Sequence, residues 1–322
     1  MDNAAGQNYK SFQNQRGRGK PVPTRGLSLV GFMDQQRQAL DHLRNFCVLS
    51  EMSEAALLGE WAAARAKVGA PHPRAGAPDI REIEPPDDAY VRELRAQPWV
   101  QTVFQAEGYR DAAFKLVEIE PLLAHQPFVD VERSDHVCKR LRNSAVAELM
   151  PLCLPRTQPA PLDPPTVIVQ EPQSLIIKSR DLQIETLRTM LMTVSHGGYD
   201  RVLAGMEISW SLPFVHVVRL SGRYYLLNGY HRALGAAKVG VTHIPCLLRE
   251  VPGEADPAWL MMPRRLFASS NPPTMGHFLH GRTHEVRLRA ISRILHVTWS
   301  HHLMPDEYEG IGPRSMARDP DA

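Results

Sequence analysis

The sequence predicts an α+β fold organised around a small mixed β-sheet. Three observations support this class. Apolar residues recur at helical spacing between Met33 and Val68. The segment 115–120 alternates between polar and apolar residues, as a half-buried strand does. Two runs rich in β-branched and aromatic residues within 214–227 flank a Ser-Gly turn and precede an alanine-rich helix.

The first 110 residues divide into a polar tail and a helical region. Residues 1–30 combine Gly, Gln, Asn, Arg and Pro with few apolar side chains, and we expect them to be unfolded. Residues 31–110 are predicted to be helical, with Ser53 as the N-cap of a second helix. Five prolines between residues 69 and 86 indicate a linker. A further helix is expected at 87–97.

Residues 111–251 form the predicted central domain. Its first strand, 115–120, should stop at Pro121. Helices are expected at 134–149 and at 181–194, where His-Gly-Gly would end the second, and a short strand at 166–169. The stretch 151–165 contains six prolines, which predicts a loop or insertion that is neither helix nor central strand and is dispensable for folding.

The most informative segment lies between Phe214 and Val251. Phe214–Leu220 and Arg223–Leu227 read as the two strands of a hairpin, joined by Ser221-Gly222. Gly229 should end the second strand abruptly. We then expect a helix from Tyr230 to Val239, stopped by a glycine, and a strand at 244–249.

The first turn of that helix carries His231 and Arg232. Cations at a helix N-terminus oppose the helix dipole, so their presence there suggests a bound anion that reverses the sign of the interaction. Free backbone N–H groups, the dipole and a guanidinium fork together suit a phosphate. The alternative interpretation is a histidine and an arginine on a surface loop.

Residues 214–251 resemble the ParB/sulfiredoxin-like superfamily, in particular its ParB-like N-terminal and nuclease-type domains. The matching motif is Asn228-Gly229-Tyr230-His231-Arg232, followed by Ala236-Ala237, Gly240 and Ile244-Pro245. The family's first motif is similar to 115–121 with Gln126-Pro127 after it. The chain departs from sulfiredoxin at Tyr230, where reductase chemistry needs a cysteine. It departs from the partition proteins at Phe128, where they carry an arginine, and no helix-turn-helix follows the domain.

The resemblance implies a nucleotide-binding site with a nucleoside triphosphate and Mg²⁺ as ligands, and with NTP hydrolysis or phosphoryl transfer as its activity. The implied phosphate-binding residues are Gln126, Asn228, Gly229, Tyr230, His231 and Arg232. Glu118 and Glu120 share one face of the first strand and are the candidate catalytic carboxylates, as general base or Mg²⁺ ligands. Asp130, Glu132 and Asp135 are equally reachable from the sequence.

Residues 252–322 are predicted to be an Arg/His-rich extension with an acidic tail. Residues 260–304 hold six Arg, no Lys and one acid. Arg287, Arg289 and Arg293 project from a strand-like run at 286–299 and could contact a DNA backbone. The alternative function is therefore a non-catalytic DNA- or protein-binding module on the same fold, or a nuclease. His277, His280 and His284 are spaced for one helical face, a possible metal site, but glycines interrupt them.

Composition restricts the class of protein further. A net charge of +2 is low for a protein that binds polyanions with its whole surface. No stretch approaches the roughly 18 apolar residues of a membrane span, and the polar N-terminus does not resemble a secretory signal. The four cysteines are widely spaced without a CxxC pair, which favours reduced thiols in a cytoplasmic protein.

Overall fold

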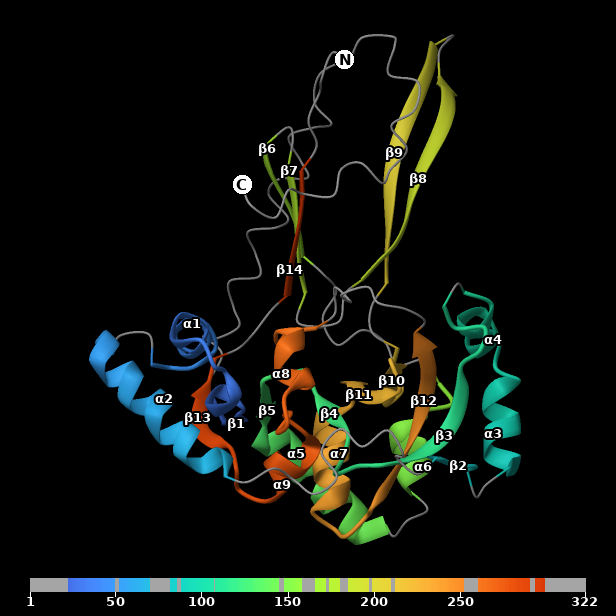
Figure 1. Cartoon of the computed structure of the whole chain (residues 1–322). Coiled ribbons are helices and arrows are strands. Elements are labelled where there is room, and N and C mark those ends of the chain that lie inside the picture. The colour runs from blue at the N-terminus through green and yellow to red at the C-terminus, as the bar shows by residue number, and fades with distance from the viewer. Residues whose placement is uncertain are drawn as a thin grey trace.

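The computed structural model describes residues 23–49, 52–69, 82–85, 88–106, 108–144, 148–157, 166–171, 174–179, 185–196, 199–209, 212–251, 260–289 and 293–298. Within these ranges the chain is a mixed α+β fold, which confirms the predicted class (Figure 1). One six-stranded sheet lies at its centre, and helices surround this sheet.

The six-stranded sheet has the strand order β2-β3-β12-β10-β11-β4. It is a mixed sheet, because β12 with β10 and β11 with β4 pair in parallel, whereas the other neighbours are antiparallel. Its strands are β2 (Glu82–Ile83), β3 (Ala113–Glu118), β4 (Leu123–Ala124), β10 (His216–Leu220), β11 (Arg223–Asn228) and β12 (His243–Val251).

The predicted hairpin is confirmed. Strands β10 and β11 pair antiparallel from Leu220 opposite Arg223 to His216 opposite Asn228. Ser221 and Gly222 both have positive φ, +50° and +75°, which matches the twist of the two strands. Helix α7 (Tyr230–Ala237) begins at the predicted residue.

Ser53 caps α2 as predicted, since its hydroxyl accepts a hydrogen bond from the N–H of Ala56 at 3.3 Å. Pro98 ends one helical stretch and occupies the first turn of the next, where no intrahelical donor is needed. The other helices are α1 (Gln36–Phe46), α2 (Glu54–Val68), α3 (Asp88–Arg95), α4 (Pro98–Gln105), α5 (Val131–Ser144), α6 (Leu149–Cys153), α8 (Arg264–Ala268), α9 (Met275–Leu279) and the 3₁₀ helix η2 (Val30–Phe32).

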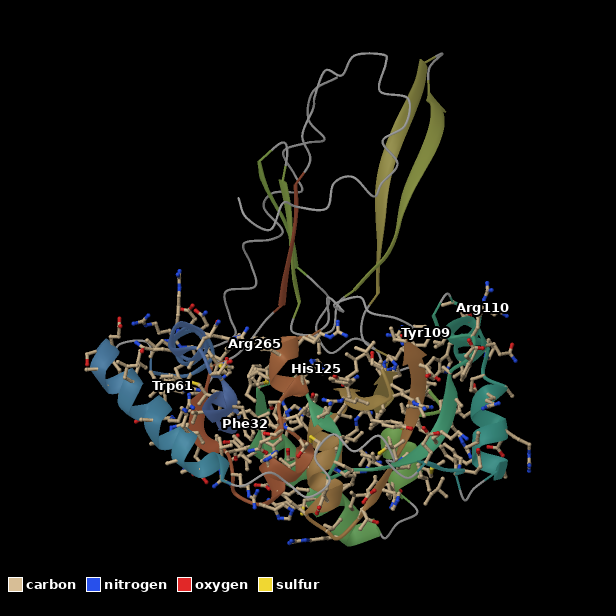
Figure 2. All side chains as sticks on the ribbon, viewed as in Figure 1. Phe32, Trp61, Tyr109, Arg110, His125 and Arg265 are labelled. Carbon is tan, nitrogen blue, oxygen red and sulfur yellow. The ribbon has the colours of Figure 1, made fainter. Side chains whose placement is uncertain are left out.

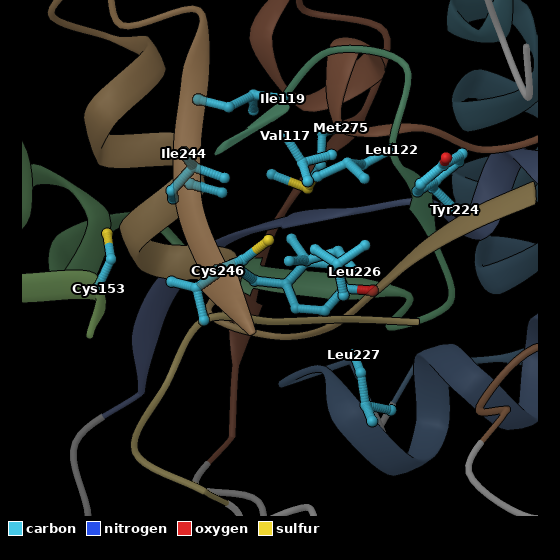
Figure 3. Packing of buried hydrophobic residues seen from close by; sticks show 14 of the residues in the cluster. Val117, Ile119, Leu122, Cys153, Tyr224, Leu226, Leu227, Ile244, Cys246 and Met275 are labelled. Carbon is cyan, nitrogen blue, oxygen red and sulfur yellow. The ribbon is translucent and has the colours of Figure 1, made fainter. Parts of the chain in front are cut away.

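One hydrophobic core crosses the predicted boundaries at 110 and 252. Side chains on one face of the sheet, among them Val117, Leu226 and Ile244, pack together with Met275 of α9 (Figure 3). Leu94 of α3 belongs to the same buried cluster. Residues on both sides of the central domain, in α3 and α9, are therefore part of its core, whereas α1, α2 and β13 contribute to a second buried cluster.

A second sheet has the order β13-β1-β5 and is antiparallel, with β1 (Thr24–Ser28), β5 (Phe128–Asp130) and β13 (His284–Leu288). The prediction that residues 1–30 are unfolded is wrong for 24–28; residues 1–22 lie outside the described part. Gly26 explains the close pairing, because a Cβ at this position would lie 2.3 Å from Leu288 Cδ1. The partner strands are distant in sequence, so the local composition gave no sign of them.

The helix predicted at 181–194 is wrong. Residues 185–196 form strand β8 (Glu185–His196), which pairs antiparallel with β9 (Tyr199–Ser209). Three threonines and a valine within β8 favour a strand over a helix, and the partner strand supplies the hydrogen bonds. Figure 1 shows this hairpin extending away from the six-stranded sheet.

The strand predicted at 166–169 is confirmed as β6 (Thr166–Glu171). It joins β7 (Ser174–Ser179) and β14 (Arg293–Thr298) in a sheet of order β14-β7-β6. The run predicted at 286–299 is thus two strands, β13 and β14, that belong to different sheets.

The first residues of the proline-rich stretch 151–165 belong to the core. This corrects the prediction that the whole stretch is a loop or insertion. Pro151 lies within the first turn of α6, a position that tolerates proline, and Cys153 and Leu154 are fully buried. The Cys153 carbonyl accepts the N–H of Val215, and the Leu154 carbonyl accepts the hydroxyl of Tyr90 at 2.7 Å. Residues 151–154 are therefore integral to the fold, while 158–165 lie outside the described residues.

Candidate phosphate-binding site

The turn between β11 and α7 depends on Gly229. Its φ is +102°, and a Cβ there would lie 2.8 Å from Val215 Cγ2, so both conformation and space favour glycine. The side-chain amide of Asn228 donates to the Leu212 carbonyl at 2.9 Å. Asn228 therefore ties the end of the strand to the preceding loop.

Arg232 contacts the protein rather than open solvent. Its guanidinium donates to the carbonyls of Pro213 at 2.5 Å, Phe214 at 3.1 Å and Leu152 at 3.3 Å. Burial lowers the pKa of Arg232 from its usual value. The Arg232 side chain therefore anchors α6 and the loop before β10 to α7. It makes these contacts in place of the phosphate contact that the sequence suggested.

Tyr230 and Gln126 also use their polar groups internally. The Tyr230 hydroxyl accepts the N–H of Gln126 at 3.0 Å, and burial raises the pKa of Tyr230 above its usual value. The Gln126 side-chain amide donates to the Phe128 carbonyl at 2.7 Å. The ring of Tyr230 lies edge-on to His125, whose position in the middle of the molecule is labelled in Figure 2. These contacts fix the loop between β4 and β5 against α7.

His231 joins the start of α7 to the start of α5. Its Nε2 accepts a hydrogen bond from the backbone N–H of Asp130 at 3.3 Å, which places the imidazole proton on Nδ1. Burial lowers the pKa of His231 to about 4; the positive charge of Arg133 acts in the same direction, and Asp130 opposes it. The imidazole is therefore neutral at pH 7.

Asp130 is the N-cap residue of α5. Its Oδ1 accepts the N–H of Arg133 at 3.1 Å, and its carbonyl accepts the hydroxyl of Ser134 at 2.9 Å. The Arg133 side chain is 71% exposed, with its Nε 3.7 Å from Asp130 Oδ2. Arg133 is thus an exposed cation beside the capping carboxylate of Asp130, close to His231.

Helices α5 and α7 pack side by side and run in the same direction. Contacts between them advance together along both helices, from Asp130 with His231, through Ser134 with Gly235, to Asp135 with Lys238 at 2.7 Å. A Cβ on Gly235 would lie 2.6 Å from the Ser134 carbonyl oxygen, so only glycine allows this separation. Because the two helix dipoles point the same way, their positive N-terminal ends add where Asp130 meets His231.

The structure places Glu118 and Glu120 elsewhere. Glu118 lies opposite His243 at the start of β12, and the N–H of the next residue, Ile119, donates to the carbonyl of Thr242. Glu120 lies 3.4 Å from His280. Thr242 follows the C-terminal end of α7, a helix about 12 Å long at 1.5 Å per residue. The strand end that carries these carboxylates therefore lies toward the C-terminal end of α7, whereas His231 lies in its first turn.

Asp130 is the carboxylate that the fold brings to His231. The sequence did not distinguish Asp130 from Glu132 and Asp135 as the catalytic carboxylate, and it gave no role to Arg133. A usable signal was present, since Asp130 comes directly before an amphipathic run with Ser134 in its first turns, the pattern of an N-cap.

The three histidines that the sequence spaced for one helical face lie in different surroundings in the structure. His277 in α9 forms a capping box with Thr274, His280 lies beside Glu120, and His284 in β13 contacts Glu60 Oε2 at 2.7 Å. Among the described residues, no group of three or more His, Cys, Asp or Glu side chains is placed to hold a metal ion.

The arginines of the predicted extension also separate. In β13, His284, Val286 and Leu288 are buried while Arg287 is exposed; Arg289, which follows the strand, is exposed too. Arg287 lies directly opposite Arg25 of β1, a residue that the sequence did not single out. Arg293 begins β14 in a different sheet, and its side chain lies outside the described part.

Comparison of the chain with family models, with curated proteins and with solved structures finds no match. In the described ranges, no helix combines the length and the apolar character needed to span a bilayer.

Proposed function

We propose that the chain is a ParB/sulfiredoxin-like protein that binds the phosphates of a nucleotide where α5 and α7 begin. The observation that carries the proposal is the parallel packing of these two helices, whose N-termini meet at the hydrogen bond from Asp130 to His231. Two positive helix ends side by side repel each other, and a bound anion relieves that repulsion.

The ligand groups follow from the contacts. The first backbone N–H groups of α7 have no intrahelical acceptor, and no side chain caps that helix. Arg133 is exposed and can move onto a phosphate, and neutral His231 can donate from Nδ1. Arg232 supports the site by anchoring α7 rather than by touching the ligand.

Asp130 fits the single carboxylate that Mg²⁺ commonly takes from a protein alongside phosphate oxygens. Mg²⁺ held by this carboxylate would offset the negative charge of the phosphates, so we expect nucleotide binding to require Mg²⁺. NTP hydrolysis or phosphoryl transfer would then use Asp130 in the role that the sequence suggested for Glu118 and Glu120. We also propose a cytoplasmic protein, and the four buried free cysteines support this location.

Replacing Arg133 with alanine is expected to weaken nucleotide binding about ten- to a hundredfold, because one charge-assisted hydrogen bond contributes about 1.5–3 kcal/mol. The measurement is calorimetric titration with ATP, CTP and GTP, with and without Mg²⁺. Arg140→Ala is the matched control, since Arg140 lies two turns further along α5 and pairs with Glu148. Equal affinity of both variants, or no binding by the wild type, would contradict the proposal.

A second candidate function, DNA binding, rests on Arg25 and Arg287. Like charges directly opposite each other on neighbouring strands are destabilising. The carboxylate of Asp135 lies 3.6 Å from the Arg25 guanidinium, and both side chains are exposed, so this ion pair is weak. A phosphate backbone across β1 and β13 would relieve this repulsion, and Arg289 extends the same exposed row.

For this candidate we expect the double variant Arg25→Ala/Arg287→Ala to reduce the slope of log K against log salt by about 2, since each lost phosphate contact contributes about 0.9. Fluorescence anisotropy with a labelled duplex measures it. Arg65→Ala, on the exposed side of α2, should leave the slope unchanged. A salt-independent affinity, or the same loss in all variants, would exclude this surface.

A further inference from the structure

A hollow of about 390 Å³ lies between α4, the end of α3 and the loop that leads into β3. Its size is within the range of small-molecule sites. Figure 2 shows Arg110 beside α4 at the edge of the molecule, well away from His125, which neighbours the start of α7. The residues that line the hollow are Arg95, Gln101, Phe104, Gln105, Arg110 and Ala112.

The charge of this hollow is positive on two sides. Arg95 comes from the last turn of α3, and Arg110 comes from the loop after α4. The lining includes no carboxylate, and none of the ion pairs among the described residues involves Arg95 or Arg110. Asp111 follows Arg110 but is not part of the lining. Two guanidinium groups without a neutralising acid between them attract an anion.

The hollow also has an aromatic wall. The guanidinium carbon of Arg95 lies 5.7 Å from the centroid of the Phe104 ring, and Phe104 stands edge-on to Phe114 at 5.5 Å. The edge-on contact with a fully buried ring holds Phe104 in place. Arg95 and Phe104 thus offer a charged group and a flat apolar surface to the same ligand.

The loop that carries Arg110 is fixed by its neighbours. The ring of Tyr109 lies 4.6 Å below the guanidinium of Arg249 and 5.7 Å from the ring of His216. The N–H of Ala112 donates to the Tyr109 carbonyl at 3.1 Å, which closes the turn around Arg110. Gln101 and Gln105 lie one helical turn apart on α4 and add amide groups to the opposite wall.

We propose that this hollow binds a small organic anion, a phosphate or carboxylate group carried on a flat aromatic ring. The anion would contact Arg95 and Arg110, and the ring would stack on Phe104. This site goes beyond the nucleotide site proposed above, because the two share no residue and their ligands can be tested separately.

The test uses phenyl phosphate, benzoate and inorganic phosphate as calorimetric probes of the full chain. Phenyl phosphate is expected to bind, and Arg95→Gln or Arg110→Gln each to weaken it at least tenfold. Benzoate binding as well would identify the shared anionic group as the feature recognised. Phe104→Leu should weaken phenyl phosphate and leave inorganic phosphate unchanged.

Two matched variants keep the test specific. Arg92→Gln changes an exposed arginine one turn earlier on α3 and outside the lining, and Arg133→Ala changes the proposed nucleotide site. Both should leave phenyl phosphate binding at the wild-type level. The proposal is overturned if the wild type does not bind phenyl phosphate, or if the double variant Arg95→Gln/Arg110→Gln, with an unchanged melting temperature, binds it as tightly as the wild type.

Discussion

Replacing Arg232 with alanine is expected to lower the free energy of unfolding by about 3 kcal/mol, because a hydrogen bond that involves a charged group contributes about 1.5–3 kcal/mol. The guanidinium donates to the three carbonyls of Leu152, Pro213 and Phe214. Loss of the side chain leaves these acceptors without a donor in a poorly solvated place. Urea unfolding at neutral pH measures the change.

Two further variants separate the geometry of Arg232 from its charge. Arg232→Lys keeps the charge but cannot place two nitrogens on neighbouring carbonyls, so we expect it to recover only part of the stability. Arg140→Ala removes an exposed arginine paired with Glu148 and should cost less than about 1 kcal/mol. If Arg232→Ala were as stable as Arg140→Ala, the guanidinium would be available to a ligand, as the sequence suggested.

The part of the fold that the sequence predicted well is the part set by local chemistry. The hairpin turn at Ser221-Gly222 and the helix start after Gly229 need residues with positive φ at fixed places, and two of these three positions are glycines. The cap at Ser53 follows from the same kind of local rule.

The elements that were missed are held by partners far along the chain. Strand β1 exists because residues 284–288 and 128–130 pair with its two edges. Strand β8 has a helix-like spacing of apolar residues, yet its partner β9 decides its conformation. A short window of sequence does not contain the position of either partner strand.

The candidate site shows the same division. Gly229 and His231 were found because a strand, a glycine and a helix start follow one another in sequence. The pairing of α5 with α7 brings in Asp130 and Arg133, and that pairing depends on Gly235 meeting Ser134, a contact across 101 positions. Arg232 was assigned to the ligand because its three acceptors lie 18 to 80 residues away.

Among solution conditions, mild acid is expected to change the free energy of unfolding most. Burial lowers the pKa of His42 to about 4, of His216 to about 3 and of His231 to about 4. Their usual value is near 6.5, so the unfolded chain takes up these protons below pH 6.5 while the folded chain does not. The stability due to the neutral histidines is complete above about pH 6.5 and is lost as the pH falls toward 4.

Each histidine contributes about 1.4 kcal/mol per pH unit in this window, and the three together about 4 kcal/mol per pH unit. Urea unfolding at intervals between pH 7 and pH 4.5 gives the slope. His216→Leu removes a buried ring whose Nε2 has no hydrogen-bond partner among the described residues, so it should lower the slope by about a third. His136→Gln, at an exposed position on α5, should leave the slope as it is. A pH-independent stability in the wild type, or equal slopes for wild type and His216→Leu, would show that the buried histidines exchange protons with water in the folded state.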